Sequence, residues 1–323
     1  MAIKLVLQLF KTLLLWLFVT TILILLILLP RGDSKIDYSK SRVEMTEEYE
    51  KNITTFSWES YKNNITDFFS YAIKNRSLGQ TEYGVSVEYE VWRYTKKSIY
   101  ILLPSIIISF IFGVVKGIYD FKVDKKAFNL FGEKITSFFL SVPDFFVIIA
   151  IQVGIMALID LGFPHVKLYG SETLSNKLFA IGFLSIYPTF YIARITENYL
   201  SSESGRDYVR TAIGKGTSSK KIIYLHMLNN CWIRVVGQIN TLVLYILSNL
   251  FIVEFLTGYR GGAYRFYQAF HVPKQFSIGS SMNIDIPIVV EFIVLFTTIV
   301  LLTKIVSDMI HSILLRREAT IEK

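Results

Sequence analysis

Long apolar runs alternate with polar segments along the chain. Each run is largely free of charge and close to the length, about 20 residues, that an α-helix needs to cross the hydrocarbon core of a bilayer. The six runs are 12–29, 98–115, 135–159, 178–193, 235–253 and 286–312. A transmembrane barrel would show alternating segments of about ten residues instead. The pattern therefore predicts an all-α integral membrane protein with six transmembrane helices.

The first run is expected to be a retained span. Lys4 and Lys11 precede it and Pro30 closes it, but no small-residue cleavage site follows, as a signal peptide would require. Residues 31–97 form a long polar segment between the first two spans. Because loops longer than about 60 residues can cross the membrane despite their basic residues, we expect this segment outside the cytoplasm. Its aromatic residues favour partial folding against the membrane surface.

The distribution of positive charge predicts the orientation of the spans. Lysines and arginines are concentrated in connections 116–134 and 194–234 and in the tail, whereas connection 160–177 holds only two lysines. Cytoplasmic loops of membrane proteins carry an excess of Lys and Arg. With six spans, all the basic segments fall on the side of the N-terminus. The N- and C-termini are therefore predicted to be cytoplasmic.

These assignments divide the rest of the chain into a core and a tail. Residues 98–315 are predicted to form a five-helix transmembrane core with a cytoplasmic loop at 201–226, and residues 316–323 a cytoplasmic tail. The connection 254–285 is rich in glycine and aromatic residues. It is predicted to be a re-entrant or surface-lying segment.

The sequence offers no pattern for covalent chemistry. The net charge of +8 does not indicate nucleic acid, because the basic residues lie between spans without a recognition motif. Gly214 to Thr217 looks faintly like a phosphate-binding loop, but Val209 and Gly216 stand where that loop needs a Gly and a Ser or Thr. The four histidines lack metal-ligand spacing, and Cys231 is the only cysteine. We predict no catalytic residue, no metal site and no enzymatic activity.

Three acidic residues within the apolar runs are candidates for function. An unpaired charge at mid-bilayer costs several kcal/mol, so such residues usually have a role or a partner. Asp144 follows Pro143 near the middle of the third run, where a kink would free backbone groups. Glu254 ends the fifth run, and Glu291 lies a turn inside the last. The alternative is that each carboxylate reaches an interface or pairs with a cation on a neighbouring helix. For Glu254 and Glu291 we favour this alternative. For Asp144 both interpretations stay open.

The polar stretch 207–226 predicts a compact helical hairpin. Asp207 is placed to cap a first helix, and Gly216 is placed to end it in a left-handed conformation. Ser218 can cap a second helix. Tyr208, Val209, Ala212 and Ile213 share one face of the first helix, outside which lie Arg206, Arg210 and Lys215. Such a helix could dock into a groove of another protein or lie on anionic lipid.

The residues of this hairpin are similar to those of a known loop. Those that stand in register with it are Asp207, Tyr208, Val209, Arg210, Thr211, Ala212, Lys215, Gly216, Ser218, His226, Leu228 and Asn230. The segment resembles the cytoplasmic EAA-type loop of bacterial ABC importer permeases, and most closely the first permease subunit of the dipeptide, oligopeptide and nickel group. We therefore favour docking to a protein over binding to lipid.

Further matches follow in the same order as in that group. They are Leu78-Gly79 before the second span, Ser141 to Phe145 in the third, Pro188 with Ala193 to Thr196 before the loop, Glu254 to Gly261 after the fifth, and Ile284 to Pro287 before the sixth. The chain also departs from the pattern. Ser202 stands at the position of the loop glutamate, with Glu203 one position late. Ile213-Gly214 replaces Arg-Ala, and Arg234 and Arg260 replace prolines, which suggests a divergent member with its own matched ATPase.

The resemblance implies a type I ABC importer permease fold in a bacterial cytoplasmic membrane. A second permease subunit would complete a heterodimeric pore, two ATPase subunits would bind ATP, and an extracytoplasmic binding protein would deliver the substrate. The helix 207–216 would couple the chain to an ATPase through its apolar face. The expected substrate is a short peptide, with nickel or a metal chelate as the alternative. A permease-derived membrane sensor or assembly protein, binding through residues 31–97, and a stand-alone secondary transporter remain as other classes.

Overall fold

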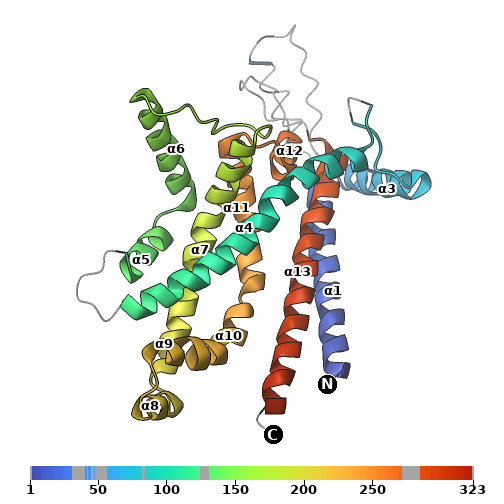
Figure 1. Ribbon diagram of the computed structural model, residues 1–323. Coiled ribbons are helices and arrows are strands. Elements are labelled where there is room, and N and C mark those ends of the chain that lie inside the picture. Colours follow the sequence, from blue (N-terminus) through green and yellow to red (C-terminus); the bar gives the residue numbers. More distant parts are fainter. Residues whose placement is uncertain are drawn as a thin grey trace. The chain divides into compact units, whose positions relative to one another are not determined.

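A computed structural model describes residues 2–30, 57–81, 84–123, 131–270 and 284–321, together with Ser41, Val43, Glu44 and Glu47. The regular secondary structure of the described residues is helical, as predicted, and an isolated bridge joins Gln80 and Ser86. Its helices are α1 (Ala2–Ile27), α3 (Trp58–Asn75), α4 (Val87–Val123), α5 (Glu133–Ser141), α6 (Asp144–Asp160), α7 (Leu174–Ser204), α8 (Asp207–Gly214), α9 (Ser219–Lys221), a π-helix (Ile222–Met227), α10 (Leu228–Val236), α11 (Ile239–Thr257), α12 (Gly262–Gln268) and α13 (Ile286–Ile321) (Figure 1).

Five helices among the described residues are long and apolar enough to cross a membrane. These spans are Leu7–Ile27, Val87–Val123, Leu174–Ser204, Ile239–Thr257 and Ile286–Ile310. The pair α5 and α6 would supply a sixth. Each of the six runs seen in the sequence therefore corresponds to one of these helices or to this pair.

The third apolar run, 135–159, is not one continuous helix, because α5 and α6 are bent by 101° at the break between them (Figure 1). Val142 and Pro143 separate the two helices, and both have extended backbones, with ψ of 133°. Proline cannot donate a helical hydrogen bond, and it disfavours the helical conformation of the residue before it. The kink expected at Pro143 is therefore a complete break in the helix.

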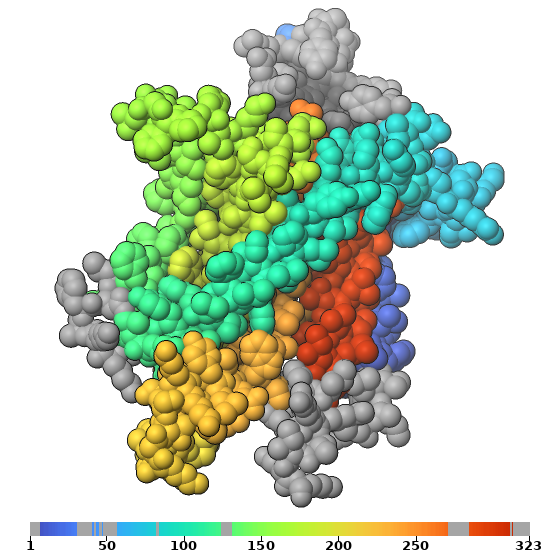
Figure 2. All heavy atoms as spheres, in the orientation of Figure 1, coloured from blue at the N-terminus to red at the C-terminus, as the bar shows by residue number. Residues whose placement is uncertain are grey.

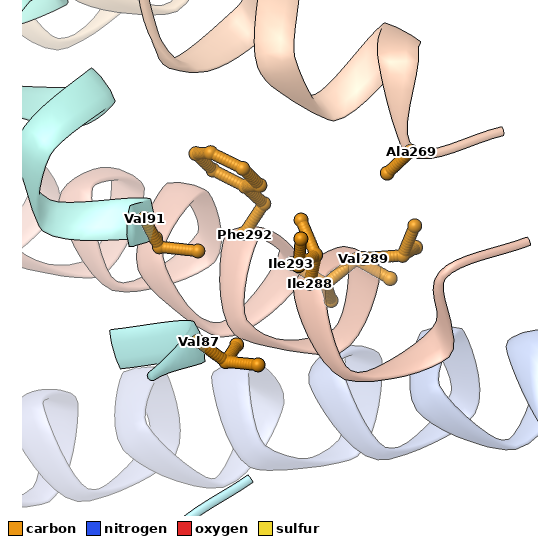
Figure 3. Close-up of a cluster of buried hydrophobic side chains, with 7 residues drawn as sticks. All are labelled: Val87, Val91, Ala269, Ile288, Val289, Phe292 and Ile293. Carbon is orange, nitrogen blue, oxygen red and sulfur yellow. The ribbon is translucent and has the colours of Figure 1, made fainter. Parts of the chain in front are cut away.

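The chain divides into two compact units, of which the first comprises residues 1–96 and 262–301. Its core brings the first turns of α4 against the start of α13 and the residue that follows α12. The buried cluster contains Val87, Val91, Ala269, Ile288, Val289, Phe292 and Ile293 (Figure 3). An ion pair between Arg265 Nε and Glu90 Oε1, 2.5 Å long, ties α12 to α4. Both side chains are buried.

Part of the predicted extracytoplasmic segment is a helix in this same unit. Ser57 caps α3 by accepting a hydrogen bond from the Ser60 amide. The Tyr61 hydroxyl donates to the Leu25 carbonyl over 3.0 Å, and Asn64 donates to the Leu28 carbonyl. The helix α3 is thereby attached to the C-terminal end of α1. Residues 31–40 and most of 42–56 lie outside the described residues, as do residues 271–283 of the expected surface-lying segment.

The second unit comprises residues 97–261 and 302–323, and α7 lies at its centre. A close contact between α4 and α7 depends on two glycines. A Cβ atom added to Gly113 would lie 2.6 Å from the Ile192 Cβ, and one added to Gly117 would lie 2.6 Å from the Thr196 Cβ. Small residues spaced four apart allow helices in membranes to approach at backbone distance. No larger residue fits at these points without a shift of α7.

Candidate functional site

The helix α8 extends from the C-terminal end of α7, after a turn at Gly205 and Arg206 (Figure 1). Arg206, not Asp207, occupies the capping position, and its side chain makes no capping hydrogen bond. The prediction that Asp207 caps the helix is therefore wrong by one residue. Asp207 lies in the first turn, where a carboxylate still interacts favourably with the helix dipole. It also forms a 3.5 Å ion pair with Arg210, and both side chains are exposed.

The predicted end of this helix is confirmed. Gly216 has a φ of +73°, a left-handed conformation that costs glycine little and a residue with a side chain more. The Gly216 amide donates to the Ile213 carbonyl and the Thr217 amide to the Ala212 carbonyl, over 2.9 and 3.1 Å. Ser218 precedes α9 at the expected capping position, without a side-chain hydrogen bond.

The apolar face predicted for α8 is divided between the protein interior and solvent. Val209 is buried, with 3% of its surface exposed, and Tyr208 and Ala212 are half-buried. Ile213, by contrast, is 61% exposed. The expectation that the whole apolar face is free to enter a groove is therefore wrong. The free surface consists of Asp207, Arg210, Thr211, Ile213, Gly214, Lys215 and Gly216. The segment that carries it is drawn in yellow at the lower edge of Figure 2.

A buried carboxylate holds the inner face of α8. The Tyr208 hydroxyl donates to Glu203 Oε2 over 2.8 Å, and Arg234 on α10 forms an ion pair with Glu203 Oε1. Burial, and then the hydrogen bond to Glu203, raise the pKa of Tyr208 to about 12. The sequence marked Glu203 and Arg234 only as separate departures from a pattern. Their opposite charges were the one available signal, and nothing in the sequence paired residues so far apart.

The three acidic residues that the sequence placed within apolar runs have different surroundings. Asp144 is half-buried in the first turn of α6, where its side chain accepts a 3.0 Å hydrogen bond from the Phe145 amide. Glu254 is fully buried on α11 and accepts a 2.5 Å hydrogen bond from the Ser98 hydroxyl. Glu291 is half-buried on α13, in the first unit. Asp144 and Glu254 therefore have different hydrogen-bond donors, the Phe145 amide and the Ser98 hydroxyl.

The described residues contain no group of three or more His, Cys, Asp or Glu side chains arranged to hold a metal ion. Of the four histidines, His271 and the side chain of His311 lie outside the described part of the chain. Cys231 is a buried free thiol on α10.

Comparison with known proteins identifies the class. Residues 105–319, about two thirds of the chain, match the model of the family described as binding-protein-dependent transport system inner membrane component. The chain therefore belongs to this family of ABC importer permeases. The all-helical fold and the spans of the structure agree with that membership.

Several relatives named for peptide transport match part of the chain. A dipeptide transport system permease protein of Bacillus subtilis (strain 168) is 26% identical over 155 residues, which are 46% of each chain. Its counterpart in Escherichia coli (strain K12) is 25% identical over 40% of this chain and 35% of the relative. A di/tripeptide transport system permease protein of Pseudomonas aeruginosa (strain UCBPP-PA14) is 27% identical over 40% of this chain and 35% of the relative. The matched region spans less than half the length of these relatives.

Proposed function

We propose that this chain is one of two permease subunits of an ATP-driven importer of short peptides in a bacterial cytoplasmic membrane. The observation that carries the proposal is the family match over residues 105–319. The names of the relatives favour peptides over the alternative of nickel or a metal chelate. A second permease subunit completes the pore, and a binding protein delivers the substrate from outside.

We further propose that α8 docks onto a cytoplasmic ATPase. Val209 and Tyr208 attach the inner face of α8 to the rest of the chain. The free surface of α8 is therefore held at a fixed position beyond the end of α7. Ile213 is an exposed apolar side chain on a helix that also carries Arg210 and Lys215. An apolar anchor with a charged surround suits a protein groove better than bulk solvent. Asp207, Thr211, Ala212 and Gly216 complete the coupling segment.

The mechanism requires no covalent chemistry in this chain. ATP binds to the partner ATPases, and their closure changes the position of the groove that holds α8. A partner can shift the equilibrium between inward- and outward-facing states only by as much as its contacts differ between those states. The role of α8 is to make contacts that differ in this way.

The test uses the assembled complex of both permeases, the ATPases and the binding protein. Ile213→Asp places a charge on the proposed anchor, whereas Leu161→Asp places one on a residue of similar exposure, 78%, beyond the opposite end of α7. We expect Ile213→Asp to insert normally but to reduce ATPase co-purification, and uptake of a radiolabelled dipeptide into proteoliposomes, at least tenfold. Leu161→Asp should leave co-purification unchanged.

The two parts of the proposal fail separately. Normal co-purification of the ATPases with the Ile213→Asp chain would refute docking through α8. Uptake of nickel ions but not of the dipeptide by the unmodified complex would refute the peptide assignment alone. An assembled complex that takes up neither would favour the sensor or assembly role.

A further inference from the structure

The carboxylate of Glu203 joins three helices. The residue lies one position before the end of α7, and its side chain is 7% exposed. One oxygen accepts from Tyr208 on α8, and the other pairs with Arg234 on α10. Each oxygen thus contacts a different helix. Loss of Arg234 would leave the buried Glu203 carboxylate without its cation, which would weaken the attachment of α8 as well as that of α10.

The network continues from Arg234 along α7. The Arg234 guanidinium lies 5.0 Å from the centre of the Tyr199 ring, a cation–π contact. Gln238 Nε2 donates to the Tyr199 hydroxyl over 3.3 Å, and Gln238 Oε1 accepts from the Tyr191 hydroxyl over 3.1 Å. The contacts therefore reach from α8 past the junction of α10 and α11 to a residue well inside the span of α7.

The short α8 needs such an attachment. It has eight residues, and isolated helices of this length are not stable in water. Val209 is its only fully buried side chain. The helix packs against the π-helix, and the hydrogen bond from Tyr208 to Glu203 connects one of its side chains to α7.

We propose that the Glu203–Arg234 ion pair, together with Tyr208, is a strut that makes α8, the adjoining end of α7 and α10 move as one body. Through it, a displacement of α8 by the ATPase is passed to α7 and α11 instead of being absorbed at the turn of Gly205. This inference rests on the proposed docking of α8.

The test replaces Arg234 and leaves the free surface of α8 unchanged. In the assembled complex, Arg234→Gln removes the charge at similar length, and Arg234→Lys keeps it. Lys304→Gln, which breaks the ion pair between Lys304 and Asp308 on α13, is the matched control. Hydrogen–deuterium exchange of the amides of residues 207–214 reports the attachment of α8. Dipeptide uptake per ATP hydrolysed, at unchanged ATPase co-purification, reports coupling.

We expect Arg234→Gln to accelerate exchange in α8 and to lower uptake per ATP, each at least tenfold, while Arg234→Lys retains most of both and Lys304→Gln changes neither. If the amides of α8 exchange in the Arg234→Gln chain at the wild-type rate, the proposal that the ion pair attaches α8 is overturned. Faster exchange with normal uptake per ATP would overturn its role in transmission. These outcomes are distinct from failure of the docking proposal, in which Ile213→Asp leaves ATPase association intact.

Discussion

At the scale of single residues, Glu254 shows how a carboxyl group is held inside this protein. Its side chain is completely buried, and Ser98 on α4 donates to it over 2.5 Å. Gly261 lies against the same group, because a Cβ atom there would collide with the Glu254 carboxylate and the Ser98 hydroxyl. A small residue and a hydroxyl donor together create the space and the polarity that this carboxyl group needs.

Removing the donor should destabilise the protein measurably. Ser98→Ala takes a hydrogen bond from a buried acceptor, which costs about 1–3 kcal/mol. Ser202→Ala, at an exposed serine on α7, should change stability by less than about 0.5 kcal/mol. Thermal unfolding of the detergent-purified chains measures the difference. Equal midpoints for the two variants would contradict the structural role given to Ser98.

At the scale of helices, the close contact of α4 with α7 depends on two glycines of α4, which have no side chain. Gly113 and Gly117 face Ile192, Ala193 and Thr196 at distances that leave no room for a methyl group. In a membrane, apolar side chains gain little by leaving lipid, so close packing is a principal source of helix association. The fit of these two glycines is therefore central to the second unit.

Filling this contact should weaken it. Gly117→Ala should lower stability by about 1–3 kcal/mol, because the added methyl group must displace α7. Gly182→Ala is the control, since Gly182 is exposed within α7 and an added Cβ there meets nothing within 4 Å. It should be neutral or stabilise by up to about 1 kcal/mol through helix propensity. Unfolding midpoints would contradict the argument if Gly117→Ala were the more stable variant.

At the scale of the whole molecule, the distribution of charge predicts the orientation in the membrane. Basic residues cluster around α8 to α10, whereas the connection between α6 and α7 carries few. These two regions lie at opposite ends of α7. The positive-inside rule then predicts α8 in the cytoplasm and the α6–α7 connection outside.

Labelling of single cysteines tests this orientation. Cys231 is the only cysteine and is fully buried, so the unmodified chain should react little with a membrane-impermeant maleimide. In spheroplasts, whose cytoplasmic membrane is intact, Leu161→Cys should be labelled and Ser219→Cys should not. Both should react after permeabilisation. The reverse pattern in intact cells would show that the chain is inserted the other way.

The lengths of the apolar runs predicted most of the fold, and the failures of this prediction have local causes. The six apolar runs reappear as five spans and a broken pair, because the length of an apolar run sets its ability to cross a bilayer. The break at Pro143 was expected as a kink, since a single proline does not reveal how far the chain turns. Gly216 was placed correctly, because its conformation depends on neighbours in the chain.

The sequence alone determined the class of protein, the positions of the apolar helices and the position of the hairpin, since these depend on local composition and on residues in fixed register. Tertiary structure decided which side of α8 is free, because the burial of Val209 and the exposure of Ile213 depend on which helices pack against α8, the π-helix among them, and not on helical periodicity. Tertiary structure also decided that Glu203 and Arg234 form an ion pair. Charges 31 residues apart meet only when two helices pack side by side, and no local pattern records that contact.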